Sequence, residues 1–174
     1  MDEVVISEYD PNWELLFKQE TSCIQAALDE HLITRIEHFG STAVPGLAAK
    51  PIIDVLVGVR SLERARQMAV SPLKQLGYAY WKENPDPQRM FFVKGLPPNG
   101  PRTHHVHMVE PSSPLWKRLV FRDYLRQHPD EAARYAHLKR QLAQRFAGDR
   151  EAYTAGKTTY IESVMQKARQ RQTH

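Results

Sequence analysis

Residues 38–57 read HFGSTAVPGLAAKPIIDVLV, and the fold is decided by the pattern within them. The run over 51–59 is dense in β-branched residues, as in a strand that is buried on both faces. Asp54 interrupts this run and, by strand alternation, shares one face with Leu56. A lone carboxylate among apolar side chains is costly unless a cation or strong donors compensate it. We therefore expect Asp54 to open onto a functional cavity; the competing interpretation is a carboxylate that caps a loop or pairs with an arginine.

Gly40 and Ser41 stand where a short strand predicted over 33–39 gives way to a loop over 40–50. A Gly-Ser pair after a strand lets backbone N–H groups and a hydroxyl approach a phosphate closely. The same loop ends on Lys50, a cation that can neutralise phosphate charge. We expect these three residues to bind substrate.

The remaining pattern predicts an α+β protein, because the strands precede most of the helices. Turns rich in Pro, Asn, Asp and Gly separate the three later strands, which favours an antiparallel meander. The helix that follows the buried strand should end at Gly77 in the C′ position. In chain order we expect a helix over 11–32, strands over 33–39 and 51–59, a helix over 62–76, strands over 78–83, 89–94 and 103–110, and three helices after residue 114, the last over 153–168.

The composition is that of a globular protein. A length of 174 residues predicts one domain over 1–174, and 41% hydrophobic with 25% charged residues excludes a disordered, collagenous or membrane-spanning chain. The apolar runs are far shorter than the ~18–20 residues of a membrane span. An acidic N-terminus and one cysteine argue against a signal peptide and a disulfide scaffold. We expect a cytoplasmic protein without a membrane partner.

Basic charge is concentrated in the last third of the sequence. Residues 1–110 hold 11 Lys and Arg against 14 Asp and Glu, a net of −3, whereas residues 111–174 hold 13 against 6, a net of +7. Such a segment either binds phosphates or nucleic acid or forms a solvated helical surface. Sequence-specific DNA binding ranks low, because we find no zinc-finger spacing, RNA-recognition motif or helix-turn-helix signature.

Two cations of this basic segment are candidates for substrate binding. Lys157 is four residues from both Tyr153 and Ile161 and should share their apolar face. It can reach a phosphate, pair with Asp123, or extend outward to solvent. Lys157, with Arg122 behind it, is the cation of this segment that we expect to face a pocket.

Residues 103–110 read THHVHMVE and suggest a second part of the site. Alternation places His105 and His107 on the same face of the predicted strand. Two imidazoles separated by one residue can converge on a metal ion or a phosphate. The other interpretation is a pair of ordinary polar histidines on a solvated face, and a position beside Asp54 would favour the site.

Three stretches together, 38–57, RTHHVHMVE at 102–110 and FRDYLRQHP at 121–129, resemble the GrpB family over roughly residues 9–164. That family is similar in fold to nucleotidyltransferases of the DNA polymerase β type, and some relatives are fused to dephospho-coenzyme A kinase. The resemblance implies a nucleotidyltransferase-like mixed sheet with an N-terminal helix and C-terminal helices. It also implies a role in nucleotide or coenzyme A metabolism.

The resemblance includes a departure from the superfamily's pattern of a Gly-Ser pair, an Asp-x-Asp/Glu strand and a third carboxylate on a neighbouring strand. Asp54 matches the first carboxylate, but the second position is Leu56. The third falls on a histidine, or on Glu110 if the strand register shifts. Two-metal phosphoryl transfer needs anionic ligands that bridge ions ~3.5–4 Å apart, which one aspartate does not supply.

Asp54, His105 and His107 could instead hold one divalent ion, Mg, Mn or Zn, and imidazole with carboxylate favours a transition ion. As a nucleotidyltransferase-like enzyme, the protein would use Asp54 and His107 in catalysis. Lys50, Arg89 or Lys157 would neutralise the phosphates of a nucleotide or phosphorylated small molecule.

Two other functions fit the same residues. The first is a non-catalytic module that binds a nucleotide or metabolite, and the missing second carboxylate supports it. The second is a mononuclear metal hydrolase in which Glu110 is the base. The sequence leaves enzyme and binding module open, as it does the oligomeric state.

Overall fold

The computed structural model describes residues 4–96 and 100–172, which form two compact units. Unit 1 comprises residues 4–10, 40–51 and 117–172, and unit 2 comprises residues 11–39 and 52–116. The chain therefore passes between the units several times. One domain over 1–174 stays a prediction, because compactness does not decide whether either unit folds alone.

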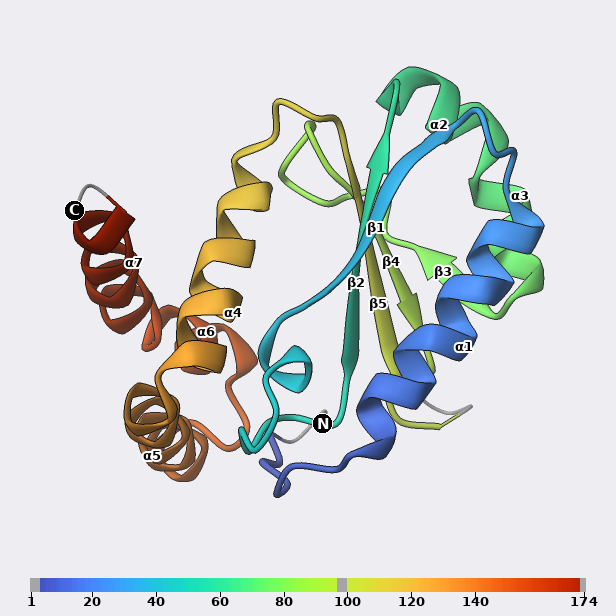
Figure 1. Cartoon of the computed structure of the whole chain (residues 1–174). Helices are drawn as coiled ribbons and strands as arrows, with labels where there is room; N and C mark the ends of the chain where they lie inside the picture. Colours follow the sequence, from blue (N-terminus) through green and yellow to red (C-terminus); the bar gives the residue numbers. More distant parts are fainter. Residues whose placement is uncertain (1–3, 97–99, 173–174) are drawn as a thin grey trace. The chain divides into compact units, whose positions relative to one another are not determined.

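Unit 2 is built on a five-stranded mixed sheet (Figure 1). Each strand lies within a predicted stretch. The expected strand over 78–83 is the most shortened, and the segment after it contains Pro85 and Pro87, which have no N–H to donate. The strands are β1 (Ile33–Phe39), β2 (Ile53–Val59), β3 (Tyr78–Tyr80), β4 (Met90–Lys94) and β5 (His104–Val109).

The strand order is β1-β2-β5-β4-β3, in which β2 and β5 pair in parallel and all other neighbours are antiparallel. The meander expected for the three later strands is confirmed. In the register, Asp54 on β2 lies between Phe39 on β1 and His105 on β5. The sheet thus brings together the two stretches that the sequence singled out.

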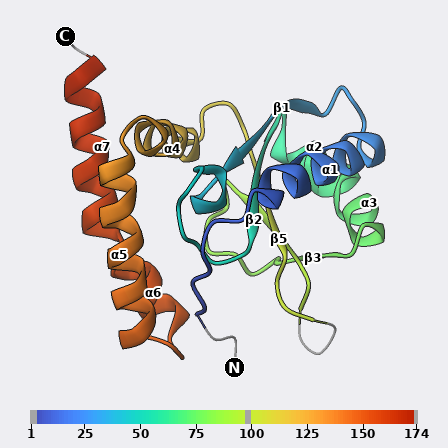
Figure 2. The ribbon, with the colours of Figure 1, turned by 60° about the horizontal axis from the view of Figure 1, so that its bottom comes forward.

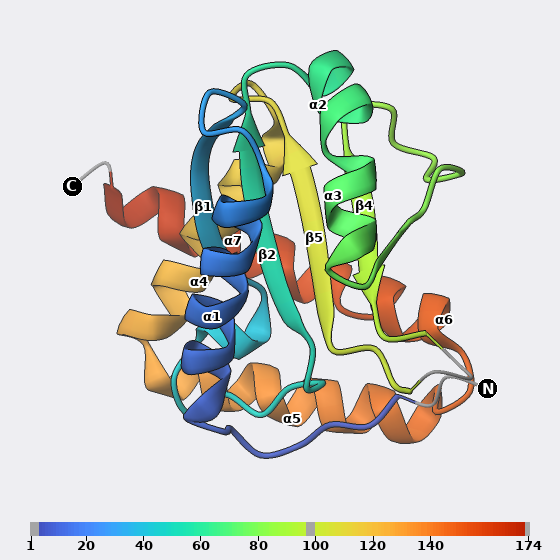
Figure 3. The same cartoon turned by 90° about the vertical axis from the view of Figure 1, so that its right-hand side faces the viewer.

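Helices cover one face of this sheet: α1 (Asn12–Ala27), α2 (Leu62–Met68) and α3 (Val70–Gln75), which face the viewer in Figure 3. The helix expected over 62–76 is interrupted at Ala69, because Pro72 cannot donate to the carbonyl four residues earlier. Gly77 has φ +89°, as expected of a C′ glycine. The helix expected over 11–32 ends earlier, before an Asx turn in which His31 N donates to Asp29 Oδ1 at 2.7 Å.

Unit 1 consists mainly of helices, and α5 lies alongside α7 in Figure 2. One helix expected over 153–168 is divided at Gly156, where a Cβ would lie 2.6 Å from Leu142 Cδ2. The elements of this unit are η1 (Ser41–Ala43), α4 (Arg118–Gln127), α5 (Pro129–Arg145), α6 (Arg150–Ala155) and α7 (Thr158–Gln172), with η2 (Pro114–Lys117) leading into α4.

The loop that follows β1 contributes to the core of unit 1. Val44, Leu47 and Ala48 are buried with apolar residues of α4, α5 and α7. The backbone of Ala49 also exchanges hydrogen bonds with that of Ser7. Within the described part of the chain, no helix is both long and apolar enough to cross a membrane.

Gly40 precedes this loop with φ +75° and ψ −174°, a conformation that is essentially restricted to glycine. We predict that Gly40→Ala lowers the free energy of unfolding by ~1–3 kcal/mol, the usual cost of such backbone strain. Urea unfolding measures this change. Gly148→Ala is the matched control, because an added Cβ there meets no described atom within 4 Å. An equal effect of the two substitutions would contradict the prediction.

Candidate functional site

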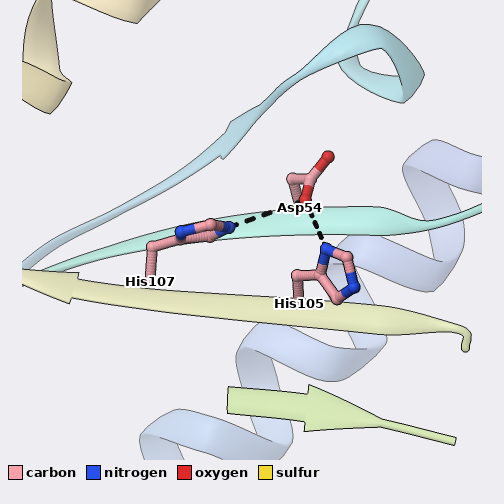
Figure 4. Close-up of side chains that lie close together, drawn as sticks. All are labelled: Asp54, His105 and His107. Carbon is pink, nitrogen blue, oxygen red and sulfur yellow. Dashed lines mark hydrogen bonds and ion pairs between the residues drawn. The ribbon is translucent and has the colours of Figure 1, made fainter. Parts of the chain in front are cut away.

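Asp54, His105 and His107 converge on the face of the sheet opposite to α1 (Figure 4). His105 Nδ1 lies 3.2 Å from Asp54 Oδ1, and His107 Nε2 lies 3.7 Å from the same oxygen. One ligand atom from each residue lies within 4.8 Å of the others. The convergence follows from the register, because Asp54 pairs with His105 and the side chain two residues later on β5 points the same way.

Aromatic rings surround the two imidazoles. The Phe91 ring centroid lies 5.0 Å from that of His105 and 4.7 Å from that of His107, and Phe39 packs edge-on against His107 at 5.1 Å. The histidine side chains are 13% and 11% exposed, whereas that of Asp54 is 27% exposed. The carboxylate is therefore the most accessible of the three groups.

Each imidazole directs one nitrogen toward Asp54 and buries the other. Among the described residues, His105 Nε2 and His107 Nδ1 are buried without a hydrogen-bond partner. Metal-binding histidines are usually oriented by a hydrogen bond at the second nitrogen. Here the contacts with Phe39 and Phe91 restrict the rings instead. Phe91 was not predicted as part of the site, because its position beside the histidines depends on the pairing of β4 with β5.

The electrostatics of the cluster favour an ionised aspartate beside a neutral histidine. Burial would raise the pKa of Asp54, but His105 and His107 outweigh it and hold this pKa well below its usual range. Burial lowers the pKa of His107, with the charges of His105 and Arg89 acting in the same direction and Asp54 opposing them. One ring nitrogen of neutral His107 therefore offers a lone pair at neutral pH.

The donor set fits a single metal ion. Two imidazole nitrogens and one carboxylate oxygen suit a divalent transition ion such as zinc or manganese, with further coordination positions left open. Asp54 and the two histidines would hold that ion. The three residues do not fit a pair of hard cations, because Leu56 occupies the next position on this face of β2 and is fully buried.

Arg89 is the predicted phosphate-binding cation that the structure places beside this cluster. Its guanidinium lies 5.5 Å from the Phe91 ring centroid, and its charge acts on His107. Arg89 Nη2 donates to Asn84 Oδ1 at 3.0 Å, and Nε lies 4.0 Å from Asp86 Oδ2. These contacts position the cation next to the aromatic ring that packs on both histidines.

The other predicted substrate-binding residues belong to unit 1. Lys50 and Lys157 both place Nζ over the Tyr153 ring, at 5.0 and 4.5 Å from its centroid. Ser41 hydrogen-bonds with Tyr135, and Gly40 immediately precedes it. Arg122 is buried, with Nε donating to Asp123 Oδ1 at 2.7 Å.

Glu110 does not supply a third carboxylate. It follows β5 by one residue and lies five residues beyond His105, roughly 17 Å along the strand. Its Oε1 accepts a hydrogen bond from Leu62 N at 2.8 Å, at the first residue of α2. The suggestion that Glu110 acts as a base is therefore wrong, because the register is not shifted and its carboxylate caps a helix.

Ionised Asp54 is favoured in the folded state, so its contribution to stability is present above the ordinary aspartate pKa of 3.8 and is lost as the pH falls toward the folded-state pKa. We predict that wild type is more stable than Asp54→Asn near neutral pH and that the difference shrinks below about pH 4. Urea unfolding at a series of pH values measures it. A difference that is constant with pH would contradict this account of the cluster.

Comparisons of sequence identify close relatives over nearly the whole chain. A family model described as GrpB protein matches residues 3–167. A UPF0157 protein of Pseudomonas aeruginosa is 48% identical over 168 residues, which cover 96% of this chain and 68% of that protein. A UPF0157 protein of Bacillus subtilis is 40% identical over 95% of this chain but only 47% of its own length. A dephospho-CoA kinase of Mycolicibacterium paratuberculosis is 30% identical, covering 91% of this chain and 44% of the kinase.

Comparisons with solved structures identify the same family. The crystal structure of conserved protein GrpB from Enterococcus faecalis matches with a TM-score of 0.85 and 34% identity, over 98% of this chain and 100% of that one. The structure of Cid1 in complex with its short product ApU matches with a TM-score of 0.52 and 13% identity, over 87% of this chain and 48% of Cid1. This second likeness concerns the fold alone and confirms the expected nucleotidyltransferase-like α+β architecture. By its sequence and its structure, the chain belongs to the GrpB family.

Proposed function

We propose that this protein holds one divalent transition-metal ion on Asp54, His105 and His107 and uses it to bind a phosphate group of a nucleotide or another phosphorylated small molecule. The observation that carries the proposal is the convergence of three ligand atoms within 4.8 Å on one face of the paired strands β2 and β5. An ion bound there would polarise a phosphoryl oxygen and neutralise part of its charge.

The ionisation states of the cluster suit this role. A metal ligand must be deprotonated, and the structure favours an ionised Asp54 and a neutral His107 at neutral pH. The packing of Phe91 on both imidazoles keeps the rings directed toward the carboxylate. Arg89 places a second positive charge at the edge of the same cluster, where it can pair with a phosphate oxygen.

The fold and the relatives favour a nucleotide as the source of the phosphate. Cid1, the structural neighbour described above, was solved in complex with its product ApU, and one relative is named a dephospho-CoA kinase. Both names involve ligands that contain a nucleotide. A link to coenzyme A metabolism is the finer form of this proposal, and it rests on the name of that single relative.

Leu56, at the position of the second carboxylate in the two-metal pattern, bears on which reaction the cluster supports. Leu56 cannot bridge a second ion, so the cluster supports binding and polarisation of one phosphate oxygen better than simultaneous stabilisation of entering and leaving oxygens. Nucleotidyl transfer, hydrolysis and binding without turnover share the same ligands. They differ in the products that appear.

We predict that zinc or manganese stabilises the wild-type protein and that His105→Gln and Asp54→Ala remove this effect. At an ion concentration of about 100 Kd the stabilisation is about 2.7 kcal/mol, which thermal unfolding detects readily. His31→Gln is the control, because the His31 side chain is 81% exposed and lies outside the cluster. If wild type gains no stability from either ion, or if His105→Gln gains as much as wild type, the proposed metal site is wrong.

A second prediction concerns the phosphorylated ligand. A nucleoside triphosphate added with manganese should raise the Tm beyond manganese alone, and Asp54→Ala should abolish the additional shift. Release of pyrophosphate would indicate nucleotidyl transfer, release of orthophosphate would indicate hydrolysis, and stabilisation without products would indicate a binding module. The absence of any additional shift with all four ribonucleotides and with phosphorylated coenzyme A precursors would contradict the proposed ligand class.

A further inference from the structure

Trp81 is an exposed aromatic side chain beside the metal cluster, and the proposed function does not use it. Its ring centroid lies 5.7 Å from that of Phe91, which in turn lies 4.7 Å from that of His107. The Trp81 and His107 centroids are therefore at most 10.4 Å apart, the sum of the two distances. Although it packs against Phe91, Trp81 is 47% exposed, and among the described residues it is the only exposed Phe, Trp or Tyr.

Strand pairing places Trp81 on the face of the sheet that carries the cluster. Phe91 on β4 pairs with His107 on β5, so these two side chains point to the same side. Trp81 follows β3 by one residue, and its N–H donates to the carbonyl oxygen of Phe91 at 2.9 Å, which extends the pairing of β3 with β4. The preceding Tyr80 pairs with Phe92 and packs against it on the opposite face. Trp81, Phe91 and His107 thus form one row across the sheet.

The loop that begins at Trp81 and ends at Arg89 is held by hydrogen bonds. Asn84 N donates to the carbonyl oxygen of Trp81 at 3.3 Å, and Asn84 Nδ2 donates to that of Arg89 at 2.9 Å. Arg66 Nη2 on α2 donates to the carbonyl oxygen of Pro87 at 2.7 Å, which ties the loop to that helix. A loop restrained in this way loses little conformational freedom when a ligand binds to it.

We propose that the Trp81 ring stacks on the base of a nucleotide whose phosphate groups lie at the metal cluster. The inference rests on the proposed function and narrows its ligand from any phosphorylated small molecule to one that contains a nucleobase. Stacking on an aromatic side chain tolerates different bases, because every base has a π-face. A sugar separates the base of a nucleotide from its phosphates, as Phe91 separates Trp81 from the histidines.

The test is calorimetric titration of the full chain in excess manganese with tripolyphosphate and with the four ribonucleoside triphosphates. We expect at least one nucleotide to bind wild type roughly tenfold more tightly than tripolyphosphate, which is the contribution typical of one stacked base. In Trp81→Leu this preference should disappear, while the affinity for tripolyphosphate should stay that of wild type. A preference of equal size in Trp81→Leu and wild type would overturn the inference.

Two further variants separate stacking from a structural role of Trp81. Trp81→Phe keeps an aromatic face and should retain part of the preference for a nucleotide. Tyr80→Leu is the matched control, because it removes the neighbouring aromatic ring from the opposite face of the sheet and should leave the preference unchanged. If Tyr80→Leu loses as much of the preference as Trp81→Leu, or if Trp81→Phe loses all of it, stacking on Trp81 is contradicted.

Tryptophan fluorescence reports on the ring itself. Of the three tryptophans, Trp13 is 3% exposed, and Trp116 donates from Nε1 to the carbonyl oxygen of Glu110 at 3.0 Å. At constant manganese, a nucleotide should quench the emission of wild type more than tripolyphosphate does, and Trp81→Leu should lack this additional quenching. Emission of wild type that a bound nucleotide leaves unchanged would contradict the inference.

The same titrations distinguish the inference from the proposed function. If the nucleotides and tripolyphosphate bind wild type with equal affinity and Asp54→Ala loses this binding, the metal site is supported and stacking is overturned. If a nucleotide quenches Trp81 equally in Asp54→Ala and wild type, stacking is supported and the metal site is contradicted. If none of the five compounds binds, the proposed function fails and the inference fails with it.

Discussion

The parallel pairing of β2 with β5 is the constraint on which the rest of unit 2 depends. It places Asp54 directly beside His105 and leaves His107 on the same face, with its Nε2 3.7 Å from the aspartate. A slip of one residue would turn the other face of β5 inward and bring His104 and Val106 to these positions. Because β1 and β4 then pair on either side, the register also decides that Phe39 and Phe91 pack against the imidazoles.

Two buried ionisable side chains meet the cost of desolvation in different ways. Asp54 has two histidines at its carboxylate, and their interactions outweigh burial, so its charge is balanced within the protein. Lys139 donates to a carbonyl and lies over an aromatic face, and burial together with neighbouring cations lowers its pKa to about 7. The first arrangement is a preorganised set of ligands.

Most of the strands and part of the candidate site could be predicted from the sequence. β-Branched runs and alternation located the five strands and predicted that His105 and His107 share a face, because side-chain direction along a strand is a local property. Helix limits were less well predicted, since the chain is interrupted at Ala69, ahead of Pro72, and at Gly156, where Leu142 leaves no room for a Cβ. The convergence of Asp54 with the histidines was conditional on strand pairing, which is a long-range property.

Features that depend on tertiary contacts could not be predicted from the sequence. Phe91 is an ordinary strand residue until the register of β4 with β5 is known. Glu110, at the end of the strand predicted over 103–110, was a candidate base, but its carboxylate caps α2, which only the tertiary structure reveals. Lys139 had a signal that was overlooked: it continues the helical spacing of buried Ala132, Tyr135 and Ala136, which predicts an inward side chain.

X-ray absorption spectroscopy of the protein loaded with one equivalent of zinc identifies the ligands of the ion. We expect a bound ion with two imidazole nitrogens in its first coordination shell at about 2.0–2.1 Å, together with oxygen ligands. In His105→Gln, which should no longer hold the ion tightly, the signal of two imidazole ligands should be lost. A shell made of oxygen alone, or a spectrum that His105→Gln leaves unchanged, would contradict the assignment of Asp54, His105 and His107 as the metal ligands.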